Sequence, residues 1–298
     1  MSTDGTIAHH ENAPSETERT FIGVDLGGTN VRAGRVEGPV VAAHESRGID
    51  RRWDEARVMD EIVSAIAAVW SDKVEGIGIG VPSVVDIVKG IVYSPANIPS
   101  WKEVRVKEIL EARFKVPVYV NNDGNCFALG EFHYGLGRGY QSIVGIVAGT
   151  GLGSGIITDG RLYCGANCGS GEIGHFPWRE ADVEYYCCGR RFDRDYGISG
   201  AELGARARKG DAEALKIFAD FGRDFSYAVQ LVLYTFDPEM IVLGGSCSKD
   251  FSFWEASMRE GLKGFYFPRA LEKLKIVVSQ ESRIAVLGAA ALCIDAER

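Results

Sequence analysis

Short apolar runs separated by glycine mark two stretches of the chain as strand–turn–strand units. In the first, Phe21 to Ala43, the runs FIGVD, VRAGRVE and VVAAH alternate with LGGTN and GP. In the second, residues 143–163, the runs IVGIVA, GIIT and RLYC alternate with GTGLGS and DG. β-Branched runs between Gly and Pro predict strands and turns. Gly28-Thr29 and Gly149-Thr150 hold the same place in each unit, which predicts a duplicated architecture and not a short-period repeat.

The rest of the chain alternates between helical and strand patterns. Apolar residues at helical spacing, such as Met59, Ile62 and Ile66, predict a helix from about Asp54. Residues 164–198 are rich in Cys, Gly and aromatic residues without a clean period, which is typical of a functional or metal-bound insertion. Strands alternating with helices place the fold in the α/β class. Further helices are expected near 104–114, 124–135, 211–236, 253–263 and 284–294, and strands at 76–81, 116–122, 240–245 and 275–279.

Composition narrows the classes of function. The 298 residues are 46% hydrophobic and 25% charged, and their 37 glycines indicate many tight turns and close backbone approaches. A net charge of −8 argues against nucleic-acid binding, which needs a basic stripe. No apolar run approaches the ~20 residues that span a bilayer, so no membrane partner is expected.

The cysteines and the first residues indicate a cytoplasmic protein with a loose beginning. Seven cysteines are scattered without a disulfide framework, and no signal peptide precedes them, so a reducing cytoplasmic setting is expected. Residues 1–20 are polar and lack periodicity, which predicts a disordered tail. His9 and His10 lie in that tail, where a solvated pair is expected more than half of a metal site.

The two glycine-rich turns are suited to holding the phosphates of ATP. A phosphate loop needs backbone N–H groups that no Cβ atom obstructs, and glycine supplies both the access and the positive φ angles. Asp25 ends a buried strand, where a lone carboxylate is costly unless it is paired or bound to a metal, so Mg²⁺ is expected there, directly or through water. The loop residues predicted to bind ATP are Asp25, Gly27, Gly28, Thr29 and Asn30 in the first turn and Gly149, Thr150, Gly151 and Gly153 in the second.

Three other interpretations of these loops were weighed. A Rossmann fingerprint needs a third glycine that leads into a helix, whereas Ser154 holds that position and β-branched residues follow. A Walker loop needs Gly-Lys-Ser/Thr, which the chain lacks. Both turns could also be simple hairpins, but two matched turns with an aspartate before one of them favour phosphate binding.

With both loops in place, the chain resembles the ROK family of sugar kinases and repressors, within the actin/hexokinase/Hsp70-like superfamily. The resemblance is carried by GVDLGGTN (23–30), NNDGN (121–125), AGTGLGSG (148–155) and GSGEIGH (169–175). It implies a two-lobed actin-like ATPase fold of duplicated βββαβα halves with a cleft between them. The N-terminal lobe would comprise 21–122 plus 285–298, and the C-terminal lobe 123–284.

The resemblance also implies a catalytic residue and a sugar site. Asp123 matches the general base that takes the proton from the sugar hydroxyl, a step for which a positioned carboxylate contributes ~10²–10⁴-fold. The alternative is that Asp123 only caps the helix that follows it. Gly244 and Gly245 would lie near the adenine, although an ordinary strand-to-helix turn would also explain them. The residues implied in sugar binding are Pro82, Ser83, Asn97, Asn122, Asp123, Glu172, His175 and Asp195.

The chain departs from the family at the zinc motif. Many members bind zinc through the His of the Gly-His pair and three cysteines, but here Tyr186 and Asp193 replace two of the cysteines and Asp195 replaces a glutamate. Only His175 and Cys188 match, and a tetrahedral zinc needs four ligands, so no zinc is expected. An improvised site from Cys164, Cys168, His175 and Cys187 or Cys188 stays conceivable. Tyr185, Tyr186 and Phe192 are expected to pack this segment as a hydrophobic plug.

The function expected from these features is ATP-dependent phosphorylation of a hexose, glucose to glucose 6-phosphate in the first place, with Mg²⁺ as cofactor. N-acetylmannosamine, N-acetylglucosamine, fructose and mannose are alternative acceptors, and polyphosphate is an alternative donor. A sugar-responsive repressor is disfavoured, because no helix-turn-helix pattern precedes Phe21 and both phosphate loops are complete. A sugar-binding ATPase or sensor without kinase activity would need the same residues. A homodimer is expected.

Overall fold

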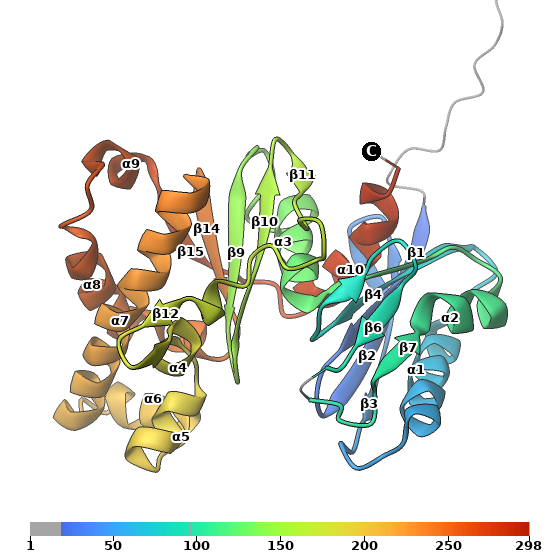
Figure 1. The fold of residues 1–298 in the computed structure, drawn as a ribbon, viewed down its shortest axis with the longest axis horizontal. Coiled ribbons are helices and arrows are strands. Elements are labelled where there is room, and N and C mark those ends of the chain that lie inside the picture. The colour runs from blue at the N-terminus through green and yellow to red at the C-terminus, as the bar shows by residue number, and fades with distance from the viewer. Residues whose placement is uncertain (1–18, 96, 298) are drawn as a thin grey trace, which may run out of the picture.

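The computed structural model describes residues 19–95 and 97–297, and its two halves each contain one five-stranded sheet (Figure 1). The first sheet has the order β3-β2-β1-β4-β8 and the second the order β11-β10-β9-β14-β15. In both, the first three strands are antiparallel neighbours and the last two run parallel to the first. The two sheets therefore have the same topology, which confirms the predicted duplication and the α/β class.

In the first half, the sheet is formed by the strand–turn–strand unit and two strands that follow helices. A small separate sheet, β5-β6-β7, was not predicted, and its last strand delays the start of the helix expected at 104. The elements are β1 (Thr20–Leu26), β2 (Asn30–Glu37), β3 (Val40–Gly48), α1 (Glu55–Val69), β4 (Val74–Val81), β5 (Val85–Asp86), β6 (Ile91–Tyr93), β7 (Glu103–Arg105), α2 (Val106–Phe114), β8 (Val118–Asn122) and α3 (Asp123–His133).

In the second half, a group of helices covers the sheet on the side away from the first half (Figure 1). The helices α6 and α9 and the short elements between residues 173 and 196 were not predicted. The elements are β9 (Ile143–Ala148), β10 (Leu152–Thr158), β11 (Arg161–Leu162), the 3₁₀ helix η1 (Ile173–His175), β12 (Pro177–Trp178), β13 (Ala181–Asp182), α4 (Val183–Cys187), α5 (Arg190–Tyr196), α6 (Gly200–Arg208), α7 (Ala212–Phe236), β14 (Met240–Gly244), η2 (Cys247–Asp250), α8 (Phe251–Leu262), α9 (Pro268–Lys273), β15 (Lys275–Val278) and α10 (Ile284–Asp295).

Helices α3 and α10 lie between the two sheets and pack against each other (Figure 1). Helix α3 contacts β9 and β10 of the second sheet, whereas α10 contacts β1 and β4 of the first. A Cβ atom on Gly288 of α10 would lie 1.7 Å from the carbonyl oxygen of Cys126 in α3, and one on Gly78 of β4 would lie 1.7 Å from the carbonyl oxygen of Ala289. These backbones touch because neither glycine carries a side chain. The exact lobe boundaries, near 122/123 and 284/285, stay a prediction.

Two further sequence predictions concern termini and membranes. The predicted tail, with His9 and His10, lies outside the described residues. Only its last two residues, Arg19 and Thr20, are described. Within the described ranges, no helix is long and apolar enough to cross a membrane.

We predict that Gly288→Ala strongly destabilises the protein. The new methyl group would overlap the Cys126 carbonyl, so α3 and α10 would have to separate, and overpacking of this kind costs about 1–3 kcal/mol or more. The free energy of unfolding, measured by urea titration, reports the loss. Gly264→Ala is the matched control, because a Cβ atom there meets nothing within 4 Å, and it should change the stability little. Equal stability of the two variants would contradict the close contact.

Candidate active site

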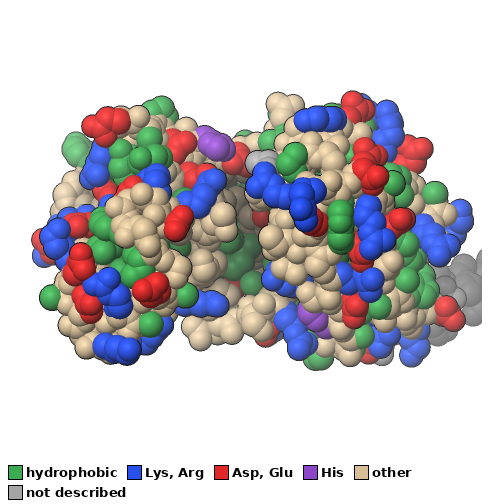
Figure 2. Space-filling view, turned by 90° about the horizontal axis from the view of Figure 1, so that it is seen from below, with side chains coloured by type: hydrophobic (Ala, Val, Ile, Leu, Met, Phe, Trp, Pro, Cys, Tyr) green, Lys and Arg blue, Asp and Glu red, His purple; other side chains and the backbone are tan. Residues whose placement is uncertain are grey.

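The predicted catalytic and binding residues gather where three parallel strands end. Strands β1, β4 and β8 are parallel neighbours, with Asp25 paired to Gly80 and Val81 to Asn122 in register. The carboxyl ends of parallel strands share one edge of a sheet, and ligands of open α/β sheets bind there. This edge brings together Asp25, Pro82-Ser83 and Asn122-Asp123. The surface of the molecule is hollowed between the two halves (Figure 2).

The first predicted phosphate loop is a tight turn. The N–H of Gly27 donates to the carbonyl of Asn30 at 2.8 Å, and a Cβ atom on Gly28 would lie 2.8 Å from that of Asn97. The turn therefore lies against Asn97, which the sequence had assigned to the sugar. The Asp25 carboxylate accepts a hydrogen bond from Arg32 at 2.9 Å. Because Asp25 has this partner, its burial alone does not require a cation.

Asn122, and not Asp123, caps helix α3. The Asn122 side chain accepts from the N–H groups of Gly124 at 2.8 Å and Asn125 at 3.4 Å. Asp123 is the first residue of the helix, and its carboxylate accepts from the Gly124 N–H at 2.9 Å. The alternative in which Asp123 serves only as the cap is therefore wrong, and one oxygen of Asp123 is left for other chemistry.

The environment of Asp123 favours its protonated form. Burial in the site and the nearby negative charge of Asp25 raise the pKa of the Asp123 carboxyl to about 7, while the Gly124 N–H works in the opposite direction. Glu172 adds a further negative charge. The pKa of Glu172 is itself raised, mainly by burial. Three carboxyl groups from three segments therefore share this site, and a pKa near the working pH is what a general base needs.

Ser154 joins the second half to helix α3, which begins at Asp123. Its hydroxyl donates to the carbonyl of Gly171 at 2.5 Å, and its own carbonyl lies 2.9 Å from where a Cβ atom on Gly124 would be. The start of α3, strand β10 and the GSGEIGH segment thus meet at one buried serine. Sequence reasoning placed Ser154 in the loop but gave it no role, because its partners lie far away in the chain.

The second predicted phosphate loop is a hairpin turn between β9 and β10. The N–H of Gly149 donates to the carbonyl of Gly151 at 2.9 Å, and the Gly149 carbonyl accepts from the Gly189 N–H at 2.7 Å. A Cβ atom on Gly149 or Gly153 would meet nothing within 4 Å, so both glycines face open space. An anion can therefore approach this backbone, as ATP phosphates require.

Glu184 fixes the second loop and was missed by sequence reasoning. Its carboxylate accepts from the N–H of Leu152 at 2.8 Å and also binds Arg190. A Cβ atom on Gly151 would lie 2.6 Å from this carboxylate, so the loop and Glu184 are in contact. The pair places one arginine beside the loop. No motif could have revealed this contact, because a long irregular segment separates Glu184 from the loop.

Glu172 and His175 lie together, as the resemblance implied. Their side chains approach to 3.8 Å, and His175 also lies 4.0 Å from Asp182. Glu172 lines a pocket of about 220 Å³ with Gly171, Ile173, Phe176 and the end of α7.

Across the site, Ser83 donates to the carbonyl of Tyr93 at 2.5 Å and accepts from Asn122 through its own carbonyl at 3.4 Å. The hydroxyl of Ser83 thus has a partner within the protein.

Two predicted residues find other partners. The Asp195 carboxylate is held by Arg194 at 2.6 and 2.8 Å and lies 3.8 Å from Arg191, so its role in sugar binding stays a prediction. Gly244 is buried, and a Cβ atom there would meet the Phe127 ring at 2.5 Å, which explains the glycine by packing. Gly245 is exposed with φ of +85°, next to the carbonyl of Ala148 at the second loop.

The segment 175–196 is anchored by an ion-pair network. Arg191 of α5 donates to Asp224 of α7 at 2.6 Å, and Arg179 forms an ion pair with the same carboxylate at 2.5 Å. Trp178 stacks on Tyr227 of α7 at 3.7 Å. Phe192 packs in the core as predicted, whereas the Tyr185 ring is 42% exposed and so lies outside the expected plug.

The improvised zinc site does not assemble. Cys168 lies in the core of the first half, whereas Cys187 and Cys188 are buried in the core of the second. Within residues 19–95 and 97–297, no group of three or more His, Cys, Asp or Glu side chains could hold a metal.

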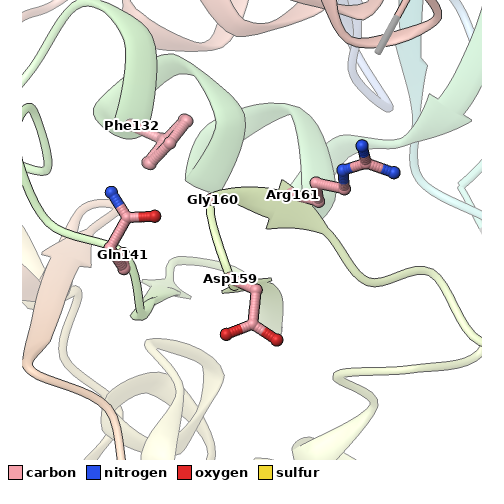
Figure 3. A pocket seen from close by; sticks show the side chains of 5 residues that line it. All are labelled: Phe132, Gln141, Asp159, Gly160 and Arg161. Atoms are coloured by element: carbon pink, nitrogen blue, oxygen red, sulfur yellow. The ribbon is translucent and has the colours of Figure 1, made fainter.

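A pocket elsewhere contains none of the predicted residues. It measures about 420 Å³ and is lined by Phe132, Gln141 and the β10–β11 turn with Asp159, Gly160 and Arg161 (Figure 3). In the close-up, the Asp159 and Arg161 side chains point in different directions, so they do not converge on one point. This hollow offers no arrangement for phosphoryl transfer.

The sequence and the fold agree on a family. Residues 21–296 match the ROK family. The chain belongs to this family. The glucokinase of Thermotoga maritima is 31% identical over 307 residues, covering 91% of this chain and 96% of that protein. The ROK family glucokinase of Streptomyces griseus, solved with glucose and AMPPNP, is 26% identical with a TM-score of 0.79, covering 92% of this chain and 98% of the other. The fold is accordingly the two-lobed actin-like one.

Regulators also belong to this family. The xylose repressor of Caldicellulosiruptor bescii is 27% identical, and the match covers 74% of this chain but 62% of the repressor. The glucokinases, in contrast, match over nearly their full length. The chain is an ATP-dependent sugar kinase of the ROK family.

We predict that Asp224→Asn destabilises the second half. The change removes the close counter-charge of the buried Arg191 guanidinium and leaves only Asp195 at 3.8 Å, and breaking a buried pair typically costs about 3–5 kcal/mol. Thermal unfolding measures the loss. Asp220→Asn on the same helix removes a more exposed carboxylate paired with Arg223 and should change the midpoint little. If the ion-pair network holds this segment without zinc, EDTA should leave the unfolding midpoint of the wild type unchanged. Near-stoichiometric zinc in the purified protein would refute zinc-free anchoring.

Proposed function

We propose that this sugar kinase transfers the γ-phosphoryl group of ATP to the 6-hydroxyl of glucose, with Asp123 as the general base. The observation that carries the assignment of Asp123 is its position at the end of β8, beside Asp25 of the first loop and Glu172 of the GSGEIGH segment, with a pKa raised to about 7. Glucose is favoured because glucokinases are similar over nearly the whole chain.

Each part of the site has a role in this reaction. The Asp123 carboxylate accepts the proton of the sugar hydroxyl as the oxygen attacks phosphorus. Glu172, His175, Asn97 and Asn122 orient the sugar through its other hydroxyls. The backbone N–H groups of the two loops receive the phosphates, and Arg190 beside Gly151 adds a positive charge there.

The residues fit a magnesium ion held indirectly. Asp25 keeps one oxygen beyond its bond to Arg32, so it would hold Mg²⁺ through a water molecule. When bound with ATP, Mg²⁺ neutralises charge on the transferring phosphoryl group. The hollow between the halves would narrow around both substrates, which excludes water from the transfer.

The proposal also covers the alternative acceptor sugars, the cellular location and the oligomeric state. Similar proteins named for N-acetyl-D-glucosamine and N-acetylmannosamine keep those sugars as the second candidates. Since all seven cysteines are free, we place the enzyme in the reducing cytoplasm. The homodimer stays a prediction.

We predict that kcat/KM for the sugar falls about tenfold per pH unit below pH 7 and levels off above it. The sign follows from the raised pKa, because below about 7 the Asp123 carboxyl is protonated and cannot accept a proton. A pH series of coupled ADP-release assays measures this. Asp123→Asn should abolish transfer at every pH and keep the fold, while Asp220→Asn keeps the wild-type profile. Turnover of Asp123→Asn within tenfold of wild type would remove Asp123 from the mechanism.

The acceptor is tested by an ADP-release screen with Mg²⁺. We expect glucose to give the highest kcat/KM among glucose, mannose, fructose, N-acetylglucosamine and N-acetylmannosamine. Polyphosphate replaces ATP in a parallel series, and omission of Mg²⁺ should remove activity. A higher kcat/KM for an N-acetylated sugar would overturn glucose as the substrate and leave the kinase assignment intact.

A further inference from the structure

Two cysteines meet beside the active site without forming a disulfide. Cys164 and Cys168 lie in the loop between β11 and η1, and their thiols share a hydrogen bond. Both contact the same amide, because Cys168 Sγ lies 3.3 Å and Cys164 Sγ 3.9 Å from Asn121 Oδ1. Asn121 is two residues before Asp123. The pair therefore contacts the end of the strand that leads to Asp123, without reaching Asp123 itself.

Cys168 also ties the two halves together. It follows β11 of the second half, yet its side chain is 2% exposed and packs in the core of the first half with Val85. The backbone of Cys168 has φ of +55°, a left-handed conformation that a non-glycine residue adopts only when its surroundings hold it there. Glu172 follows four residues later, so the position of Cys168 governs where the sugar-binding segment begins.

The surroundings stabilise a thiolate. The Asn125 amide donates to Cys164 Sγ and Cys168 Sγ, each at 3.8 Å, and the Asn121 amide donates to Cys164 Sγ at 3.4 Å. The hydrogen bond from Cys164 and the backbone N–H groups of Asn122 and Val85 lower the pKa of Cys168 to about 7, whereas the pKa of Cys164 is raised. A low thiol pKa with a second thiol in contact is the arrangement of reactive, redox-sensing cysteines.

We propose that Cys164 and Cys168 form a redox-sensitive dithiol, and that hydrogen peroxide converts it to a disulfide that lowers sugar phosphorylation. The half-buried Cys164 is the sulfur that peroxide reaches, and it becomes a thiolate by passing its proton across the hydrogen bond to Cys168, against the preference of the reduced pair for a thiolate at Cys168. It attacks one peroxide oxygen and becomes a sulfenic acid, with one water released. The Cys168 thiol then displaces the second water, so two thiols lose two electrons and one peroxide becomes two waters.

The disulfide changes the site through Asn121 and Cys168. A disulfide holds its sulfurs at about 2.05 Å, so Cys168 Sγ moves from the backbone N–H groups of Asn122 and Val85 toward Cys164. Asn121, whose Oδ1 also accepts from the N–H of Asn122 at 2.8 Å, loses both thiol donors. Since Asn122 caps α3 and precedes Asp123, both the base and the sugar-binding segment shift. The other five cysteines are buried and have no such partner among the interactions of the described residues.

Peroxide treatment of the whole enzyme tests this. We expect about a tenfold loss of kcat/KM for glucose, recovery with dithiothreitol, and a mass decrease of about two hydrogens mapped to a 164–168 linkage. Cys164→Ser and Cys168→Ser should stay active and resist peroxide, because serine keeps the hydrogen-bond donor to Asn121. Cys293→Ala, which removes a buried thiol elsewhere, should stay as sensitive as the wild type.

Three results would overturn the proposal. They are a peroxide-treated enzyme without the 164–168 linkage, a linked enzyme with unchanged kcat/KM, and a Cys164→Ser variant that loses activity as the wild type does. The linkage is measured by mass and does not depend on the substrate. If glucose is not the acceptor, the same comparison is made with the sugar that the acceptor screen identifies, so the two proposals fail separately.

Discussion

The geometry of the site depends on the contact between the backbones of α3 and α10. Gly288 places α10 directly on the carbonyl of Cys126, and Gly78 lets the same helix lie on β4. Helix α3 begins at Asp123, and α10 rests on the strands β1 and β4, which end at Leu26 and Val81. One helix therefore holds Asp123, the proposed base, at a fixed distance from the first predicted phosphate loop. Any side chain at Gly288 would alter that distance, because close-packed interiors transmit small displacements.

The same packing forces carboxyl groups together. Asp25, Asp123 and Glu172 come from three segments, and their mutual repulsion and burial raise the pKa of Asp123. A raised folded-state pKa means that the native protein holds this proton more tightly than the unfolded chain does. The stability from it is present below pH about 4 and is lost as the pH rises toward 7. The folded protein therefore gains the least stability from Asp123 at the pH where its carboxylate could act as a base. Such a conflict between stability and activity is common at catalytic sites.

The loops and the topology could be predicted because they depend on residues that lie close together in the sequence. Contacts between residues far apart in the sequence could not be predicted. Glycine turns between β-branched runs are encoded within a few residues, so both sheets could be predicted with their duplication. The cap of α3 could not, because Asn122 and Asp123 are adjacent and either can cap a helix. Ser154, Glu184 and the Arg179–Asp224 pair act on partners far along the chain. Gly244 likewise has a long-range reason to be glycine, since a Cβ atom there would meet the Phe127 ring, and its predicted place near the adenine stays a prediction.

The irregular segment after β11 is where these long-range contacts have the most consequence. At its start, Cys168 is inserted into the core of the first half, and at its end Arg179 and Arg191 bind Asp224 on a helix of the second. Glu172 and His175, which we propose to bind the sugar, lie between these two anchors and so belong to neither half alone. A movement of one half relative to the other must displace them against one anchor. Ion pairs hold the anchor on the second half, whereas the anchor on the first half is a thiol, whose chemistry can change.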